Sequence, residues 1–160
     1  MTASSTKPLP ATFAVGSMTK PGGIDIVQVV LPKPGYGEAL VRIEATAICT
    51  WEQRSYSGAQ DNKFPFVGGH ESAGIVVDLG PDYRGPLKTG DRVAVGGASC
   101  GSCHWCLTNQ DRVCTGHYSG SVSYDCGWGP GGFAEYKIHP SDGLAFVGDT
   151  AANIASLTEP

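Results

Sequence analysis

Four cysteines lie within a fifteen-residue segment of the sequence, with the pattern Cys100-x2-Cys103-x2-Cys106-x7-Cys114. Four thiolates at about 2.3 Å complete the tetrahedral shell of a structural Zn²⁺. An iron–sulfur cluster is the main rival, because its Cys-x2-Cys-x2-Cys runs overlap this pattern. Free or disulfide-paired thiols are a further alternative. Since the fourth cysteine is not followed by proline, the spacing favours zinc, with His104 facing solvent inside the loop.

A second group of residues has types that suit a reactive metal. Cys49 follows a predicted strand and opens a predicted short helix, whose N-terminus would favour the thiolate form. His70 and Glu71 follow a glycine just before another predicted strand. A histidine in isolation is more often a hydrogen-bonded structural residue than a ligand. Together, however, a cysteine, a histidine and a third ligand with an open position are typical of catalytic zinc.

Composition limits the classes of protein to which the chain can belong. Its 160 residues suit one domain, with a flexible tail over residues 1–10 and the folded part over residues 11–160. Fifteen acidic and eleven basic side chains give a formal charge of −4, which disfavours binding to nucleic acid. No apolar run is long enough to span a membrane and no signal peptide is visible, so we expect a cytoplasmic protein.

The elements that must position these ligands are mostly strands. Twenty-three glycines and eleven prolines favour turns and strands over helices. We expect a mainly β fold with short helices, either a barrel or a sandwich. The helices are expected at Thr50–Tyr56 and over residues 151–157, the second capped by Asp149 or Thr150. The strands are expected at Ile24–Leu31, Ala39–Ile48, Ala73–Leu79, Arg92–Val95 and Phe133–Ile138.

These motifs, taken in order, resemble the zinc-containing medium-chain alcohol and polyol dehydrogenases, with sorbitol and threonine dehydrogenases as the nearest pattern. The resemblance covers about residues 22–160. The matching motifs are Cys49 with Glu52, where the family usually has Asp; Gly69-His70-Glu71-x2-Gly74-x5-Gly80; Gly90-Asp91-Arg92-Val93; the four cysteines; Gly131-Gly132-Phe133-Ala134-Glu135-Tyr136; and Leu157-x-Glu159-Pro160.

The resemblance implies a GroES-like β-barrel catalytic domain that carries two zinc ions. Cys49 and His70 would bind the catalytic ion, Glu71 would be a labile or neighbouring ligand, and Glu159 would stand where the family supplies a further ligand. Cys100, Cys103, Cys106 and Cys114 would bind the structural ion. The implied reaction is hydride transfer between a secondary alcohol or polyol and NAD or NADP, in a protein that is a homo-oligomer when intact.

Two departures from the family pattern leave alternatives open. Trp51 stands where the family usually has the Ser or Thr that relays the substrate proton, with Thr50 next to it. No Gly-x-Gly-x-x-Gly turn for a dinucleotide occurs, so we expect a fragment that lacks its Rossmann domain and has little turnover alone. The alternative is a non-catalytic GroES-like zinc module, or an atypical member with an altered proton relay.

Three remaining side chains are expected to lie outside both metal sites. Cys126 is expected to be a buried or half-buried thiol, while His117 and His139 have no partner at ligand spacing and are expected at the surface.

Overall fold

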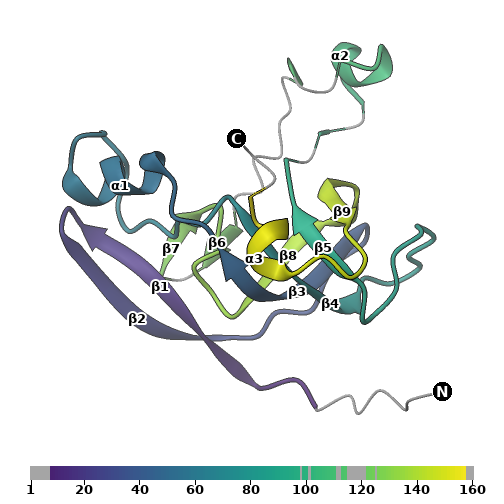
Figure 1. The fold of residues 1–160 in the computed structure, drawn as a ribbon, viewed down its shortest axis with the longest axis horizontal. Helices are drawn as coiled ribbons and strands as arrows, with labels where there is room; N and C mark the ends of the chain where they lie inside the picture. Colours follow the sequence, from purple (N-terminus) through teal and green to yellow (C-terminus); the bar gives the residue numbers. More distant parts are fainter. Residues whose placement is uncertain are drawn as a thin grey trace.

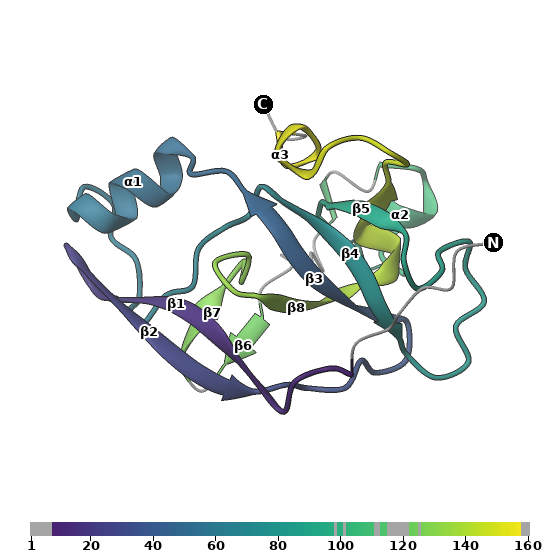
Figure 2. The same ribbon diagram turned by 60° about the horizontal axis from the view of Figure 1, so that its bottom comes forward.

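The computed structural model describes residues 8–97, 99–100, 102–110, 113–114, 122–124 and 126–157. Within them, short strands are grouped around one antiparallel five-stranded sheet (Figures 1 and 2). The expectation of a mainly β fold with short helices is therefore confirmed. None of the helices in this part of the chain is long and apolar enough to cross a membrane.

The five-stranded sheet has the strand order β8-β3-β4-β5-β9. Its register places Val41 of β3 opposite Val76 of β4 on one side and Lys137 of β8 on the other. Because paired residues in antiparallel strands share a face, these side chains lie on the same face of the sheet. The strands are β3 (Glu38–Thr46), β4 (Ser72–Leu79), β5 (Arg92–Val95), β8 (Tyr136–Pro140) and β9 (Leu144–Phe146).

The main hydrophobic core lies on this face of the sheet. Valine dominates it, because branched side chains pack well on a pleated surface. Leu87, from the loop between β4 and β5, is packed in the same cluster. The buried members are Ala39, Val41, Val76, Leu87, Val93, Val95 and Leu144.

A long hairpin forms the second layer of the fold. It consists of β1 (Thr12–Lys20) and β2 (Gly23–Val30). Bridges from Val15 to Ala134 and from Met18 to Phe66 attach it to the segments around the sheet. A short pair, β6 (Val122–Tyr124) and β7 (Gly127–Gly129), lies near the hairpin in both views (Figures 1 and 2). Phe13, Val15 and Val67 form the second core cluster.

The helices in the described residues are all short. Helix α1 (Thr50–Ser57) follows β3, and the one-turn helix α2 (His104–Leu107) lies on a loop that extends away from the sheet (Figure 1). A 3₁₀ turn (Ser141–Gly143) joins β8 to β9. Helix α3 (Ala152–Ala155) packs against β3, β4 and β5.

Several sequence expectations are wrong in detail. Strand β8 begins at Tyr136 rather than Phe133, and α3 has Ala151 at its N-cap, so neither Asp149 nor Thr150 caps it. His139 is fully buried rather than at the surface, because it lies opposite Ala39 on the apolar face of the sheet.

Strand β1, Cys126 and His117 complete the comparison with the sequence expectations. Strand β1 (Thr12–Lys20) was not expected as a strand, although it carries two of the three residues of the second core. Cys126 is half-buried, as expected. His117 lies outside the described residues.

Candidate metal centres

The end of β3 and the start of α1 position Cys49. Cys49 is the N-cap of α1, and its Sγ accepts a hydrogen bond from the backbone N–H of Trp51 at 3.5 Å. Glu52, three residues on, accepts the N–H of Cys49 at 3.1 Å through Oε2. This reciprocal arrangement is a capping box with cysteine in place of serine. The sulfur is therefore held at the positive end of the helix, where negative charge is stabilised.

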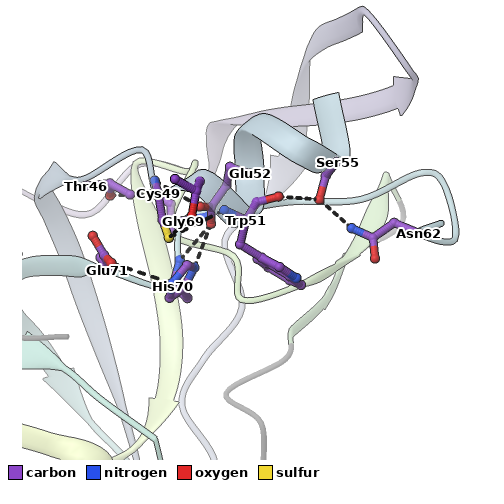
Figure 3. Close-up of polar contacts among 11 residues, drawn as sticks. Thr46, Cys49, Trp51, Glu52, Ser55, Asn62, Gly69, His70 and Glu71 are labelled. Atoms are coloured by element: carbon purple, nitrogen blue, oxygen red, sulfur yellow. Dashed lines mark hydrogen bonds and ion pairs between the residues drawn. The ribbon is translucent and has the colours of Figure 1, made fainter. Parts of the chain in front are cut away.

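Glu52 also holds His70, from the segment that precedes β4 (Figure 3). Its Oε1 accepts the Nδ1–H of His70 at 2.7 Å and the backbone N–H of Gly69 at 3.0 Å. Because both oxygens of Glu52 already face backbone N–H groups, the carboxylate acts as the acceptor and Nδ1 of His70 as the donor, which leaves the Nε2 lone pair for a metal. Only 1% of Glu52 is exposed, so water does not compete for these contacts.

Three potential metal donors meet at this point of the fold. The ligand atoms of Cys49, His70 and Glu71 all lie within 4.8 Å of one another, and each residue is half-buried. Nε2 of His70 lies 3.8 Å from Oε1 of Glu71. Thiolate, imidazole and carboxylate together are a donor set that suits zinc, so the residues present fit a Zn²⁺ ion.

One wall of this site is aromatic. The ring of Trp51 meets those of His70 and Phe66 edge-on, with centroid separations of 5.5 and 5.1 Å. The hydroxyl of Thr50 lies 3.8 Å from Sγ of Cys49. Thus Trp51 contacts the imidazole through its indole, while the neighbouring Thr50 places a hydroxyl beside the sulfur.

The four-cysteine loop brings its sulfur atoms together around a common point. The Sγ atoms of Cys103 and Cys106 are 3.5 Å apart, those of Cys103 and Cys114 are 3.7 Å apart, and those of Cys100 and Cys106 are 3.9 Å apart. A tetrahedron with metal–sulfur bonds of about 2.3 Å has edges of about 3.8 Å. The cluster therefore has the size of a closed tetrahedral zinc site.

The loop affects its thiols unequally: despite a hydrogen bond from the backbone N–H of Cys100, burial and the neighbouring thiols raise the pKa of Cys114 to about 11. The backbone N–H groups of Ser102 and Cys103 lower the pKa of the exposed Cys100 thiol to about 7. His104 is exposed and packs edge-on against Trp105, so it is not part of the sulfur cluster, as expected.

The structure thus brings together most of the residues that the sequence singled out. Glu159 lies outside the described residues. The sequence pattern identifies Glu52 only as an acidic residue at family spacing and does not predict it as the partner of His70. A signal was available, because an acidic residue at the third position of a helix that begins after Cys49 is typical of a capping box.

Comparison with known proteins agrees with this geometry. Residues 35–149 match the family described as the alcohol dehydrogenase GroES-like domain. The chain is 36% identical over 130 residues to an alcohol dehydrogenase of Geobacillus stearothermophilus, across 79% of this chain and 37% of that protein. It is 39% identical over 132 residues to an L-threonine 3-dehydrogenase of Pyrococcus horikoshii, across 79% of this chain and 36% of that protein.

Solved structures show the same fold. A cobalt- and zinc-bound thermostable alcohol dehydrogenase of Pyrobaculum aerophilum superposes with a TM-score of 0.74 at 27% identity, over 91% of this chain and 44% of that one. An acetophenone reductase of Geotrichum candidum in complex with NAD gives a TM-score of 0.77 at 28% identity, over 94% and 44%.

The mainly β fold thus carries one cluster of a cysteine, a histidine and a glutamate, and a separate loop with four cysteines. The chain belongs to the alcohol dehydrogenase GroES-like domain family, as its sequence motifs predicted. It spans little more than a third of the length of these curated relatives.

Proposed function

We propose that the chain is the zinc-binding catalytic domain of an oxidoreductase that interconverts a secondary alcohol or polyol and its ketone with NAD or NADP. The observation that carries this proposal is the meeting of Cys49, His70 and Glu71 within 4.8 Å at the N-terminus of α1. The named activities of the relatives, alcohol and threonine oxidation, support the reaction class.

The chain's own residues have distinct tasks in this proposal. Cys49 and His70 would hold the catalytic zinc, with Glu71, or Glu159, as a further ligand. When bound, zinc would act as a Lewis acid that polarises the substrate oxygen. Glu52 keeps the proton of His70 on Nδ1, so that Nε2 faces the ligand cluster. Cys100, Cys103, Cys106 and Cys114 would bind the structural zinc.

Thr50 and Trp51 would shape the substrate side of the site. Thr50 carries the hydroxyl that lies beside Cys49, and we propose that it relays the substrate proton in place of the usual residue, accepting that proton while its own hydroxyl proton passes to water. Trp51 would supply an apolar wall, because its ring is held against His70 and Phe66. Indole can donate a hydrogen bond but cannot pass on a proton from an alcohol.

Zinc content and turnover together test the proposal. The purified chain should contain two zinc ions, and the Cys49→Ala/His70→Ala variant should contain one while its far-ultraviolet circular dichroism stays unchanged. In the expressed full-length protein the same substitutions should abolish NAD(P)-dependent oxidation of secondary alcohols. Retention of both ions and of full turnover by the double variant would contradict the assignment.

A second candidate is a non-catalytic zinc module, favoured by Trp51 at the position where a relay hydroxyl is usual. It predicts zinc in the four-cysteine loop alone, in a well-folded chain. The same zinc measurement separates it from the first candidate, because that candidate requires an ion at Cys49 and His70.

We further propose a small-molecule partner, a cytoplasmic location and a homo-oligomeric assembly for the whole protein. Cys49, Cys100, Cys106 and Cys114 are not joined in disulfides, which is the state that zinc binding requires and that a reducing compartment maintains. Sedimentation of the full-length protein would test its assembly, and cell fractionation its location.

A further inference from the structure

Gly68 is buried directly before the Gly69-His70-Glu71 motif, and its backbone has a conformation open to any residue. Its surroundings, however, leave no room for a side chain. A Cβ atom at this position would lie 2.9 Å from Cγ of Glu52 and 2.9 Å from Cε2 of Phe133. Side-chain carbons do not approach this closely, so at least one of the two neighbours would have to move.

The next residue, Gly69, is needed for a different reason. Its φ of +91° is a left-handed backbone conformation, and its Cβ would lie 2.7 Å from the backbone of Gly132 and Phe133. Gly69 is thus required by the path of the chain. Gly68 is required by two side chains, of which one is the carboxylate arm that orients His70.

Glu52 has little freedom to move away from an added methyl group. Oε2 is bound to the N–H of Cys49, and Oε1 is bound to the N–H of Gly69 and the Nδ1–H of His70. A shift of Cγ therefore moves a carboxylate that connects the two donors Cys49 and His70. The arm is one methylene longer than that of the aspartate usual in the family, and Cγ of Glu52 occupies the space that a side chain at position 68 would take.

We propose that Gly68 is a positioning residue of the catalytic site, because its missing side chain makes the space through which Glu52 reaches His70. The inference rests on the proposed function, in which His70 is a metal ligand. The side chains at positions 52 and 68 must therefore fit together in size. Glutamate at position 52 requires glycine at position 68, whereas aspartate at position 52 would leave room for alanine at position 68.

A double-mutant cycle on Zn²⁺ affinity tests this match. Chain whose four-cysteine loop already holds one zinc is titrated with Zn²⁺ against a competing chelator. Gly68→Ala and Glu52→Asp should each weaken the second ion roughly 10- to 100-fold, as losses of ligand-orienting contacts do. The double variant should bind as well as Glu52→Asp alone, because the shorter acid no longer meets the methyl group.

The melting temperatures of the same four proteins serve as a control for the zinc affinities. The added methyl still meets Phe133 in both backgrounds, so Gly68→Ala should lower the melting temperature equally in the wild type and in the Glu52→Asp variant. Gly97→Ala is the matched control, because that glycine has an ordinary backbone and nothing within 4 Å of its Cβ. An equal loss of zinc affinity in both backgrounds would overturn the proposal.

A metal-free measurement separates this inference from the proposed function. The ¹⁵N shifts of the His70 ring should show the Nδ1–H form in the wild type and in Gly97→Ala, and a mixture of tautomers in Gly68→Ala. If Gly68→Ala shows the mixture of tautomers but the wild-type chain binds no second zinc, the role of Gly68 is supported and the proposed catalytic function is refuted. If the ¹⁵N shifts of the His70 ring and the zinc affinity are both unchanged in Gly68→Ala, the role of Gly68 is refuted and the proposed function is unaffected.

Discussion

The two candidate zinc sites are assembled in opposite ways. The four-cysteine site would take all its ligands from one loop, and a shared zinc ion would join its four sulfur atoms. The Cys49–His70 site joins the segment after β3 to the segment before β4, and a protein carboxylate, Glu52, already connects them. One site is therefore expected to depend on its metal for its shape, and the other on buried hydrogen bonds.

The largest expected effect is loss of a ligand in the four-cysteine loop. Cys103→Ser should weaken Zn²⁺ binding there on the order of a thousandfold, because a structural site draws its order from metal binding. Hydrogen exchange of the amides around α2 should speed up as well. The Cys49–His70 site should keep its zinc in this variant, as metal analysis would show. Parallel loss of both ions would mean that the two sites are not independent.

The next effect concerns the sheet that both sites share. Lys137 faces the apolar core opposite Val41, and burial lowers the pKa of its ammonium group from 10.5 to about 7. The unfolded chain thus binds this proton at pH values where the folded chain does not. The free energy of unfolding should therefore rise from pH 7 to pH 10, by an amount on the order of 4 kcal/mol.

Lys137→Met is the variant that isolates this contribution. Urea unfolding should show that the rise with pH is lost and that the protein is stabilised at pH 7, while both zinc affinities stay unchanged. A pH dependence identical to that of the wild type would exclude Lys137 as its source. A change in the zinc affinity of one site alone would show that the sheet supports that site more than the other.

A smaller effect is expected from Glu52→Gln, which keeps the shape of the carboxylate and removes its charge. The new amide NH₂ would face N–H donors, so we expect a destabilisation of about 1–3 kcal/mol. Zinc binding at Cys49 and His70 should weaken roughly tenfold. The four-cysteine loop should be unaffected, as chelator competition would reveal. Equal weakening of zinc binding at both sites would contradict the view that Glu52 supports the Cys49–His70 site alone.

The smallest effect is expected at Trp51. Its ring lies against His70, so Co²⁺ bound beside that residue should quench its fluorescence. Trp51→Phe should remove this quenching and change the free energy of metal binding by less than about 1 kcal/mol, because the aromatic contact is kept. Trp105, beside His104 in the four-cysteine loop, would report on that loop instead. Persistent quenching in the variant would place the cobalt elsewhere.

The difference between a site within one loop and a site that joins distant segments also explains which features the sequence could predict. The four-cysteine site follows from spacing along one loop, and Cys49 at the start of a helix follows from local pattern. The bond between Glu52 and His70 depends on how β3 and β4 pair, and so on contacts distant in sequence. Local pattern does not predict the burial of Lys137 and His139, because polar and charged side chains of these types are more often exposed.

Anomalous diffraction at the zinc edge, from crystals of the chain grown with zinc, would locate the ions at both candidate sites. We predict two peaks per chain: one enclosed by the four cysteine sulfurs, and one between Sγ of Cys49 and Nε2 of His70, with Nδ1 of His70 still bonded to Glu52. A single peak in the four-cysteine loop, with an ordered and metal-free His70, would contradict this prediction.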